Sequence, residues 1–192
     1  ELSYKRAIAA MPIAGSYRAV DFALSNMTNS HVQKVAVLTQ YNAKSLNEHL
    51  NSSKWWDFGR KHGGLYVFTP SITADNGYWY RGTADSIWQN IDILKNSHEP
   101  YVIIAPAGTD VSRFGVVSMN EDSRIVNFEE KPMASQSTTV STGIYIIRRR
   151  QLIELIEKCA EEERFDFVSD ILIRYKNIKK IYGYKMDSYW SN

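Results

Sequence analysis

The chain has 192 residues, of which 44% are hydrophobic and 23% are charged, and its formal net charge is +2. This composition is typical of a soluble globular domain, and so small a charge argues against nucleic acid or an anionic membrane as a partner. The single cysteine, Cys159, excludes an intrachain disulfide, and no segment resembles a membrane span or a signal peptide, so we expect a cytoplasmic protein.

The first half of the chain alternates between predicted helices and strands. Val20, Leu24 and Met27 share one face of a helix, and Val35 begins a short apolar run that is typical of a strand buried on both faces. In chain order, the predicted elements are a helix around Val20, a strand at 35–39, a helix at 42–50, a strand at 65–68 and a helix after Thr83.

The second half continues this alternation. Two strands flank the turn-forming residues 120–123 and predict a β-hairpin. In chain order, the predicted elements are strands at 101–105, 115–119, 124–128 and 144–147, helices at 151–160 and 166–175, and a strand at 181–184. The whole pattern predicts an α/β fold with a doubly wound, mostly parallel sheet, whose ligands lie at the carboxyl ends of the strands.

The segment 79–90 combines features that suit a phosphate-containing ligand. Gly82 allows close approach of the backbone to a ligand, and Thr83 has the side chain of a helix N-cap. A helix that begins here directs free N–H groups toward a phosphate, Arg81 adds a cation, and Trp79 and Tyr80 add rings that stack on a base or sugar. The alternative interpretation is an ordinary capped helix whose aromatic side chains lie in the core.

One junction is too short for a parallel crossover. A buried strand that ends at Ala105 needs a dozen or more residues before the next parallel strand, which begins at Gly115. A hairpin return is one explanation. The other is that the single predicted domain, residues 1–192, lacks a segment between Gly108 and Thr109, and the Cα atoms of these two residues would then lie far beyond the ~3.8 Å of a bonded pair.

Six segments carry particular residues in a fixed order. They are Pro12–Asn26, Leu38–His49, Trp79–Asp85, Arg113–Gly115, Phe128–Pro132 and Ser141–Tyr145. The set resembles ADP-glucose pyrophosphorylase (glucose-1-phosphate adenylyltransferase), the sugar nucleotidyltransferase of bacterial glycogen and plant starch synthesis. The resemblance implies a tetramer in which a nucleotidyltransferase domain precedes a left-handed β-helix that would lie outside these 192 residues. It also implies that glucose 1-phosphate attacks the α-phosphorus of ATP with the help of Mg²⁺.

The same resemblance assigns residues to two sides of a binding site. The sugar-phosphate side consists of Glu130, Lys131, Ser141, Gly143 and Asp166, with Lys131 as the phosphate cation. The nucleotide side consists of Gln40, Tyr80, Arg81, Gly82 and Thr83.

The sequence departs from the family pattern where charge is needed. Ile8 replaces a lysine, whereas Ala107 and Asn192 replace the two carboxylates that bind the metal. The glycine-rich loop that wraps the triphosphate has no counterpart within these 192 residues. The four histidines have no metal-ligand spacing and are expected on the surface. We therefore expect no catalytic residue, no metal site and no cofactor in this chain, although active relatives use Mg²⁺.

These departures favour the regulatory, non-catalytic subunit type of Gram-positive bacteria. Such a subunit assembles with a catalytic ADP-glucose pyrophosphorylase subunit in a hetero-tetramer, and glucose 1-phosphate or a sugar-phosphate effector is a candidate ligand. The alternative is a catalytically active glucose-1-phosphate adenylyltransferase with displaced catalytic residues. A different sugar nucleotidyltransferase is disfavoured, because the matches from Gln40 to His49 and from Tyr80 to Asp85 are particular to the ADP-glucose branch.

Overall fold

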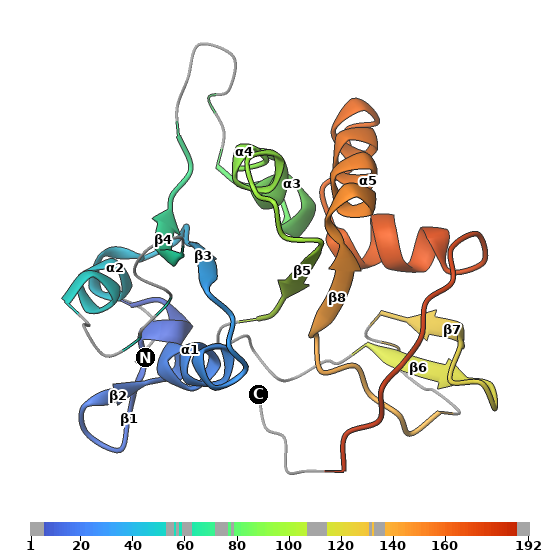
Figure 1. Cartoon of the computed structure of the whole chain (residues 1–192), viewed down its shortest axis with the longest axis horizontal. Helices are drawn as coiled ribbons and strands as arrows, with labels where there is room; N and C mark the ends of the chain where they lie inside the picture. Colours follow the sequence, from blue (N-terminus) through green and yellow to red (C-terminus); the bar gives the residue numbers. More distant parts are fainter. Residues whose placement is uncertain are drawn as a thin grey trace. The chain divides into compact units, whose positions relative to one another are not determined.

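The computed structural model describes residues 6–52, 56, 58, 63–71, 77, 79–106, 115–130, 132 and 137–187 (Figure 1). The chain divides into two compact units. The first contains Glu1–Tyr80 and Pro106–Thr109, and the second contains Arg81–Ala105 and Asp110–Asn192.

The first unit is built around a parallel pair of strands. In chain order it contains the 3₁₀ turn η2 (Ile8–Ala10), β1 (Pro12–Ile13), β2 (Tyr17–Arg18), α1 (Ala19–Asn29), β3 (Lys34–Leu38), α2 (Lys44–Ser52) and β4 (Gly64–Phe68). Strands β3 and β4 pair in parallel from Lys34↔Gly64 to Leu38↔Phe68, with α2 in the crossover, whereas β1 and β2 form an antiparallel pair. The core consists of Ala9, Ala10, Val20, Leu24, Val35, Leu46, Leu50 and Phe58.

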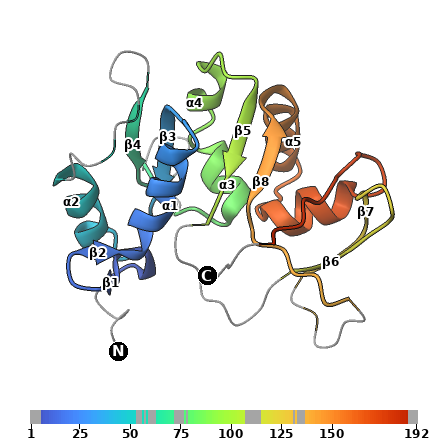
Figure 2. The ribbon, with the colours of Figure 1, turned by 60° about the horizontal axis from the view of Figure 1, so that its bottom comes forward.

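The second unit contains the remaining elements. They are α3 (Thr83–Trp88), α4 (Asp92–Lys95), β5 (Tyr101–Ile104), β6 (Val116–Met119), β7 (Ile125–Glu129), β8 (Tyr145–Arg148), α5 (Arg149–Glu161) and the π-helix η3 (Val168–Ile173). Strand β5 pairs antiparallel with β8, and β6 pairs antiparallel with β7 (Figure 2). Helix α5 packs against α3, β5 and β8 through its apolar stripe, which consists of Leu152, Leu155, Ile156 and Cys159.

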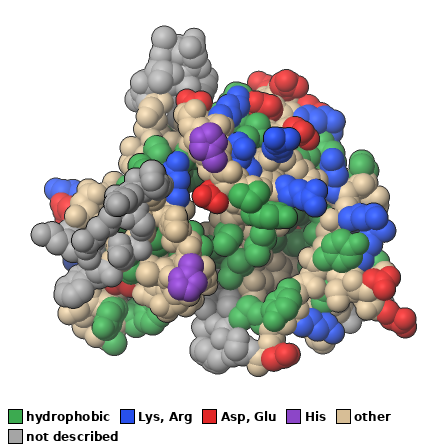
Figure 3. All heavy atoms as spheres, viewed as in Figure 1, with side chains coloured by type: hydrophobic (Ala, Val, Ile, Leu, Met, Phe, Trp, Pro, Cys, Tyr) green, Lys and Arg blue, Asp and Glu red, His purple; other side chains and the backbone are tan. Residues whose placement is uncertain are grey.

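One face of the β5–β8 pair carries exposed apolar side chains. Tyr101 and Ile103 alternate with half-buried neighbours along β5, and Ile146 is exposed on β8 opposite Ile103. Hydrophobic side chains accordingly gather over these strands in the space-filling view (Figure 3). On the opposite face, Val102, Ile104 and Ile147 pack against the core cluster. Both faces of this pair are therefore apolar, but one is exposed and the other lies against the core.

The predicted α/β fold is confirmed, and most predicted elements are present. Parallel pairing occurs in β3–β4, and the other strand pairs of the described residues are antiparallel. The helix predicted at 166–175 is present, and its central residues form the π-helix η3. The segment predicted to be missing between Gly108 and Thr109 falls outside the described residues.

The strand predicted at 181–184 is wrong. Tyr182 makes only an isolated bridge to Arg124, flanked by hydrogen bonds from Ile125 N–H to Ile181 C=O and from Gly183 N–H to Ser123 C=O. Pairing ends there because Ser123, at φ 61°, turns its own chain away from the extended direction. The apolar composition of this segment predicted a strand, but Tyr182 forms a single bridge and no ladder follows from it.

Candidate functional site

Several residues predicted for the sugar-phosphate side gather around Tyr145. The Ser141 Oγ and Tyr145 Oη atoms lie 3.2 Å apart, and Gly143 N–H donates to Ser141 Oγ at 3.2 Å. The carboxylates of Glu130 and Asp166 lie close enough to Tyr145 for their charges to raise its pKa. We refer to Glu130, Ser141, Tyr145 and Asp166 as the Tyr145 cluster. Lys131, the fifth predicted residue of this side, lies outside the described residues.

Gly115 brings two parts of the Tyr145 cluster together. Its carbonyl accepts a hydrogen bond from Ser141 N–H at 2.8 Å. A Cβ atom at position 115 would lie 2.8 Å from the Phe128 ring and 3.5 Å from Glu130 Oε2. A side chain at position 115 would therefore displace the buried Phe128 ring and crowd the Glu130 carboxylate.

The environment of Tyr145 keeps its hydroxyl protonated. Burial is the main cause that raises the pKa of Tyr145 above its ordinary value of 10.0, and the charges of Glu130 and Asp166 raise it further. The hydrogen bond with Ser141 lowers this pKa. A neutral phenol, a serine hydroxyl and two exposed carboxylates form a set of donors and acceptors that suits the hydroxyl groups of a sugar.

On the nucleotide side, the segment Arg81–Asp85 is held by a buried carboxylate. Asp85 is only 3% exposed. It accepts hydrogen bonds from Arg81 N–H at 2.8 Å, from Arg81 Nη2 at 3.1 Å and from Gln89 Nε2 at 2.9 Å. We refer to Arg81–Asp85 as the Arg81 segment. The Asp85 carboxylate therefore fixes both the backbone and the guanidinium of Arg81, so Arg81 is part of the structure at the start of α3.

Phe165 occupies the N-terminus of α3. Its carbonyl accepts hydrogen bonds from Ala84 N–H at 2.8 Å and from Asp85 N–H at 3.3 Å. Its ring lies 3.9 Å from the Arg81 guanidinium, and a Cβ atom at Gly82 would lie 2.3 Å from its carbonyl oxygen. The close approach for which Gly82 is needed is therefore an approach to Phe165, and these helix N–H groups already have partners within the protein.

The predicted capping role of Thr83 is wrong. Gly82 is the N-cap residue of α3, and Thr83 is the first helical residue. The Thr83 hydroxyl instead accepts a hydrogen bond from Phe167 N–H at 2.8 Å, a contact between residues 84 positions apart. The alternative interpretation of an ordinary helix holds for α3, but not for a core position of Trp79, which is 59% exposed.

Gln40 and Tyr80 contact each other within the first unit. Tyr80 N–H donates to Gln40 Oε1 at 2.6 Å, and Gln40 Nε2 donates to the Tyr80 carbonyl at 3.3 Å. The Gln40 amide thus uses both of its polar groups on the backbone of a single residue. This contact explains the pairing of the two residues without a ligand, and their role toward a nucleotide stays a prediction.

Of the three positions that depart from the family pattern, the structure describes one. Ile8 lies on η2 and is 44% exposed, whereas Ala107 and Asn192 lie outside the described residues. Within the described ranges, no three His, Cys, Asp or Glu side chains come together as a possible metal site. No helix in the part of the chain that the structure describes has both the length and the apolar character needed to cross a membrane.

One histidine differs from its predicted surface position. The His49 side chain is only 15% exposed, and its Nε2 atom lies 2.7 Å from Asp21 Oδ1. Asp21 also accepts a hydrogen bond from Arg18 N–H at 2.9 Å at the start of α1. The pair links α1 to α2, whereas His31 and His98 are exposed as predicted and His62 lies outside the described residues.

Two residues of these contacts were not predicted from the sequence. Tyr145 stood within the motif Ser141–Tyr145 without an assigned role, and its position four residues after Ser141 was an available signal. Phe165 carried no signal, because it acts mainly through its backbone carbonyl.

Comparison with known proteins identifies a family. The family model described as Nucleotidyl transferase matches residues 1–109 and 101–192 of this chain. A glucose-1-phosphate adenylyltransferase of Thermosipho melanesiensis is 32% identical over 223 residues, which cover 100% of this chain and 54% of that protein. The enzymes of the same name from Clostridium acetobutylicum and Thermomicrobium roseum are 34% and 35% identical over 100% of this chain. The chain spans 59% and 52% of their respective lengths, so it corresponds to little more than half of such a protein.

Proposed function

The chain belongs to the nucleotidyl transferase family, and from this premise we propose that it is a regulatory, non-catalytic member of the glucose-1-phosphate adenylyltransferase group. In this proposal it binds glucose 1-phosphate or a related sugar phosphate at the Tyr145 cluster and Lys131. It then modulates a catalytic partner subunit of glycogen synthesis within a hetero-tetramer.

The observation that carries the proposal is the loss of charge at three positions. The family resemblance assigns a lysine and two metal-binding carboxylates to the places of Ile8, Ala107 and Asn192. Nucleotidyl transfer depends on cations and a metal placed around the phosphates, and neither a methyl group nor an uncharged amide supplies the missing charge. Each such loss costs about 3 kcal/mol of transition-state stabilisation, so two or three of them reduce the rate by about four orders of magnitude or more.

The Tyr145 cluster supports retained binding of a sugar phosphate. Glu130 and Asp166 are exposed, and Tyr145 and Ser141 place two hydroxyl groups beside them. Lys131 directly follows Glu130 in the sequence and would supply the cation for the phosphate. A chain that binds the substrate without converting it can act as a regulatory subunit that responds to the concentration of that substrate.

A regulatory effect of this kind is a coupling free energy between subunits. The chain must favour one state of the assembly, and its ligand must bind the two states with different affinity. The test is to measure turnover by a catalytic glucose-1-phosphate adenylyltransferase subunit as the chain is added at increasing concentration. We expect a saturable change in rate or in the response to effectors, and a Lys131→Gln variant should lose the part of this change that depends on sugar phosphate.

No change in the turnover of the catalytic subunit at a saturating concentration of the chain would contradict the regulatory role. The alternative, a catalytically active enzyme with displaced catalytic residues, predicts turnover by the chain on its own. The two functions therefore differ in whether a partner is needed, and the same assay run without the catalytic subunit decides between them.

A further inference from the structure

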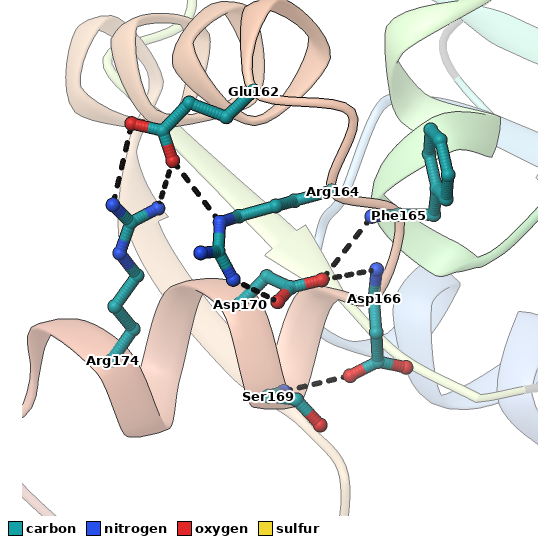
Figure 4. Close-up of polar contacts among 7 residues, drawn as sticks. All are labelled: Glu162, Arg164, Phe165, Asp166, Ser169, Asp170 and Arg174. Atoms are coloured by element: carbon teal, nitrogen blue, oxygen red, sulfur yellow. Dashed lines mark hydrogen bonds and ion pairs between the residues drawn. The ribbon is translucent and has the colours of Figure 1, made fainter.

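A network of four charged side chains surrounds the turn that follows α5 (Figure 4). Glu162 bonds the guanidinium of Arg174 through both of its carboxylate oxygens and lies 3.1 Å from Arg164 Nε. Arg164 reaches onward to Asp170 Oδ1 at 3.3 Å. The hydrogen bond from Arg174 is the main cause that lowers the pKa of Glu162, and both groups are therefore charged at neutral pH.

Asp170 is the member of the network that bonds the backbone. Its Oδ2 atom accepts hydrogen bonds from Phe165 N–H at 3.2 Å and from Asp166 N–H at 3.0 Å, while Arg164 holds the other oxygen. One carboxylate oxygen thus fixes two successive peptide groups, and Figure 4 shows both bonds converging on it. Asp166 in turn accepts Ser169 N–H through Oδ1 at 2.7 Å, which sets the direction of its own carboxylate.

The turn fixed in this way serves both regions of the candidate site. Phe165 accepts the first N–H groups of α3 and stacks on Arg81, whereas Asp166 contributes its charge to the Tyr145 cluster. Phe167 continues the connection, because its N–H bonds Thr83 and its ring lies 5.6 Å from the Tyr145 ring. Three successive residues therefore join the Arg81 segment to the Tyr145 cluster.

We infer that Asp170 is a positioning residue for sugar-phosphate binding. It orients the Asp166 carboxylate by fixing the peptide groups of residues 165 and 166, and it does so without contact with the ligand. The inference rests on the proposed sugar-phosphate site. It predicts that the effect of Asp170 on binding passes through Asp166.

The test is a double-mutant cycle measured by calorimetric titration of the full chain with glucose 1-phosphate. Asp170→Ala should weaken binding about tenfold, because the turn loses both of its bonds to a charged acceptor. Asp170→Asn keeps an amide oxygen at the same place and should bind within about threefold of the unchanged chain. In the background of Asp166→Ala, the further change Asp170→Ala should have almost no effect on the dissociation constant.

A control variant removes a charged side chain from an ion pair outside the network. Glu157 forms an exposed ion pair with Lys95 at 2.7 Å and is not one of the four charged side chains around the turn. Glu157→Ala should leave the affinity unchanged. If Asp170→Ala binds glucose 1-phosphate as tightly as Glu157→Ala, or if the losses from Asp170→Ala and Asp166→Ala simply add, the inference is overturned.

Amide hydrogen exchange measured without ligand tests whether Asp170 fixes the turn, whether or not the chain binds a sugar phosphate. Asp170→Ala should speed exchange at the amides of Phe165 and Asp166, and Glu157→Ala should not. If the unchanged chain does not bind glucose 1-phosphate, the proposed function fails and the ligand role of Asp170 fails with it. Unchanged exchange at both amides in Asp170→Ala would instead refute the positioning role itself.

Discussion

The Arg81 segment and the Tyr145 cluster lie in the same unit and both derive from family motifs, yet they use their polar groups differently. In the Arg81 segment, Asp85 and Phe165 take up the backbone N–H groups and the guanidinium of Arg81. In the Tyr145 cluster, the exposed side chains of Glu130 and Asp166 lie near a protonated phenol, and Asp166 also accepts a hydrogen bond from Ser169 N–H. The contrast teaches that a motif residue can be needed for the fold, for a ligand or for both, and only its contacts separate these roles.

The largest expected effect tests whether the Arg81 segment is structural. Asp85→Ala removes a buried acceptor of three hydrogen bonds and leaves Arg81 and Gln89 without it. We expect the free energy of unfolding to fall by about 3 kcal/mol, measured by urea denaturation. Asp92→Ala, at an exposed position in the first turn of α4, is the control and should change stability by less than about 0.5 kcal/mol. Equal stability of the two variants would contradict the structural role of the Arg81 segment.

A smaller effect tests the contact between Gly82 and Phe165. In Gly82→Ala the new methyl group would lie 2.3 Å from the Phe165 carbonyl oxygen, so the backbone must shift. We expect a loss of about 2 kcal/mol in the free energy of unfolding. Gly77→Ala is the matched control, because a Cβ atom there meets no atom of the described residues within 4 Å. Loss of ligand binding in Gly82→Ala at full stability would show that this glycine serves the ligand directly.

The Tyr145 cluster can be tested through the ionisation of its phenol. The hydrogen bond with Ser141 lowers the pKa of Tyr145 and the charge of Asp166 raises it, so Ser141→Ala should raise this pKa and Asp166→Asn should lower it. The change is read from absorbance at 295 nm during alkaline titration, as the difference between each chain and the same chain with Tyr145→Phe, because 12 tyrosines contribute to the signal. Because the pKa is raised in the folded chain, its contribution to stability is present below pH 10.0 and is lost at higher pH. Identical titrations of both variants would contradict the arrangement of the cluster.

The smallest effect concerns the acid stability of the connecting turn. The pKa of Glu162 is lowered from its ordinary value of 4.5, mainly by the hydrogen bond from Arg174, so its contribution to stability is present above pH 4.5 and is lost as the pH falls further. Glu162→Gln should therefore be slightly less stable than the unchanged chain at pH 7, and the difference should vanish in acid. Thermal unfolding at several pH values measures it, and a difference that is independent of pH would contradict the role of the charge.

The spacing of apolar residues and the positions of turn-forming residues correctly predicted several helices and strands. The apolar spacing of Leu152, Leu155, Ile156 and Cys159 identified the buried face of α5, and the turn residues 120–123 identified the β6–β7 hairpin. The same reasoning failed at residues 181–184, because the length of a strand depends on the partner that it meets.

The contacts of the candidate site were harder to predict. Phe165 acts on α3 mainly through a carbonyl, a group that every residue has, so its identity gives no signal. Thr83 has the side chain of an N-cap, but a distant backbone N–H of Phe167 bonds its hydroxyl instead. Both contacts depend on how segments far apart in the sequence come together, which residue types alone do not specify.

The most direct test of catalytic silence is pyrophosphate release by the chain alone, with ATP, glucose 1-phosphate and Mg²⁺ at saturating concentrations. We predict no release above the protein-free reaction, although the same sample should give heat on titration with glucose 1-phosphate. Turnover at the rate of an ordinary active subunit would contradict the account.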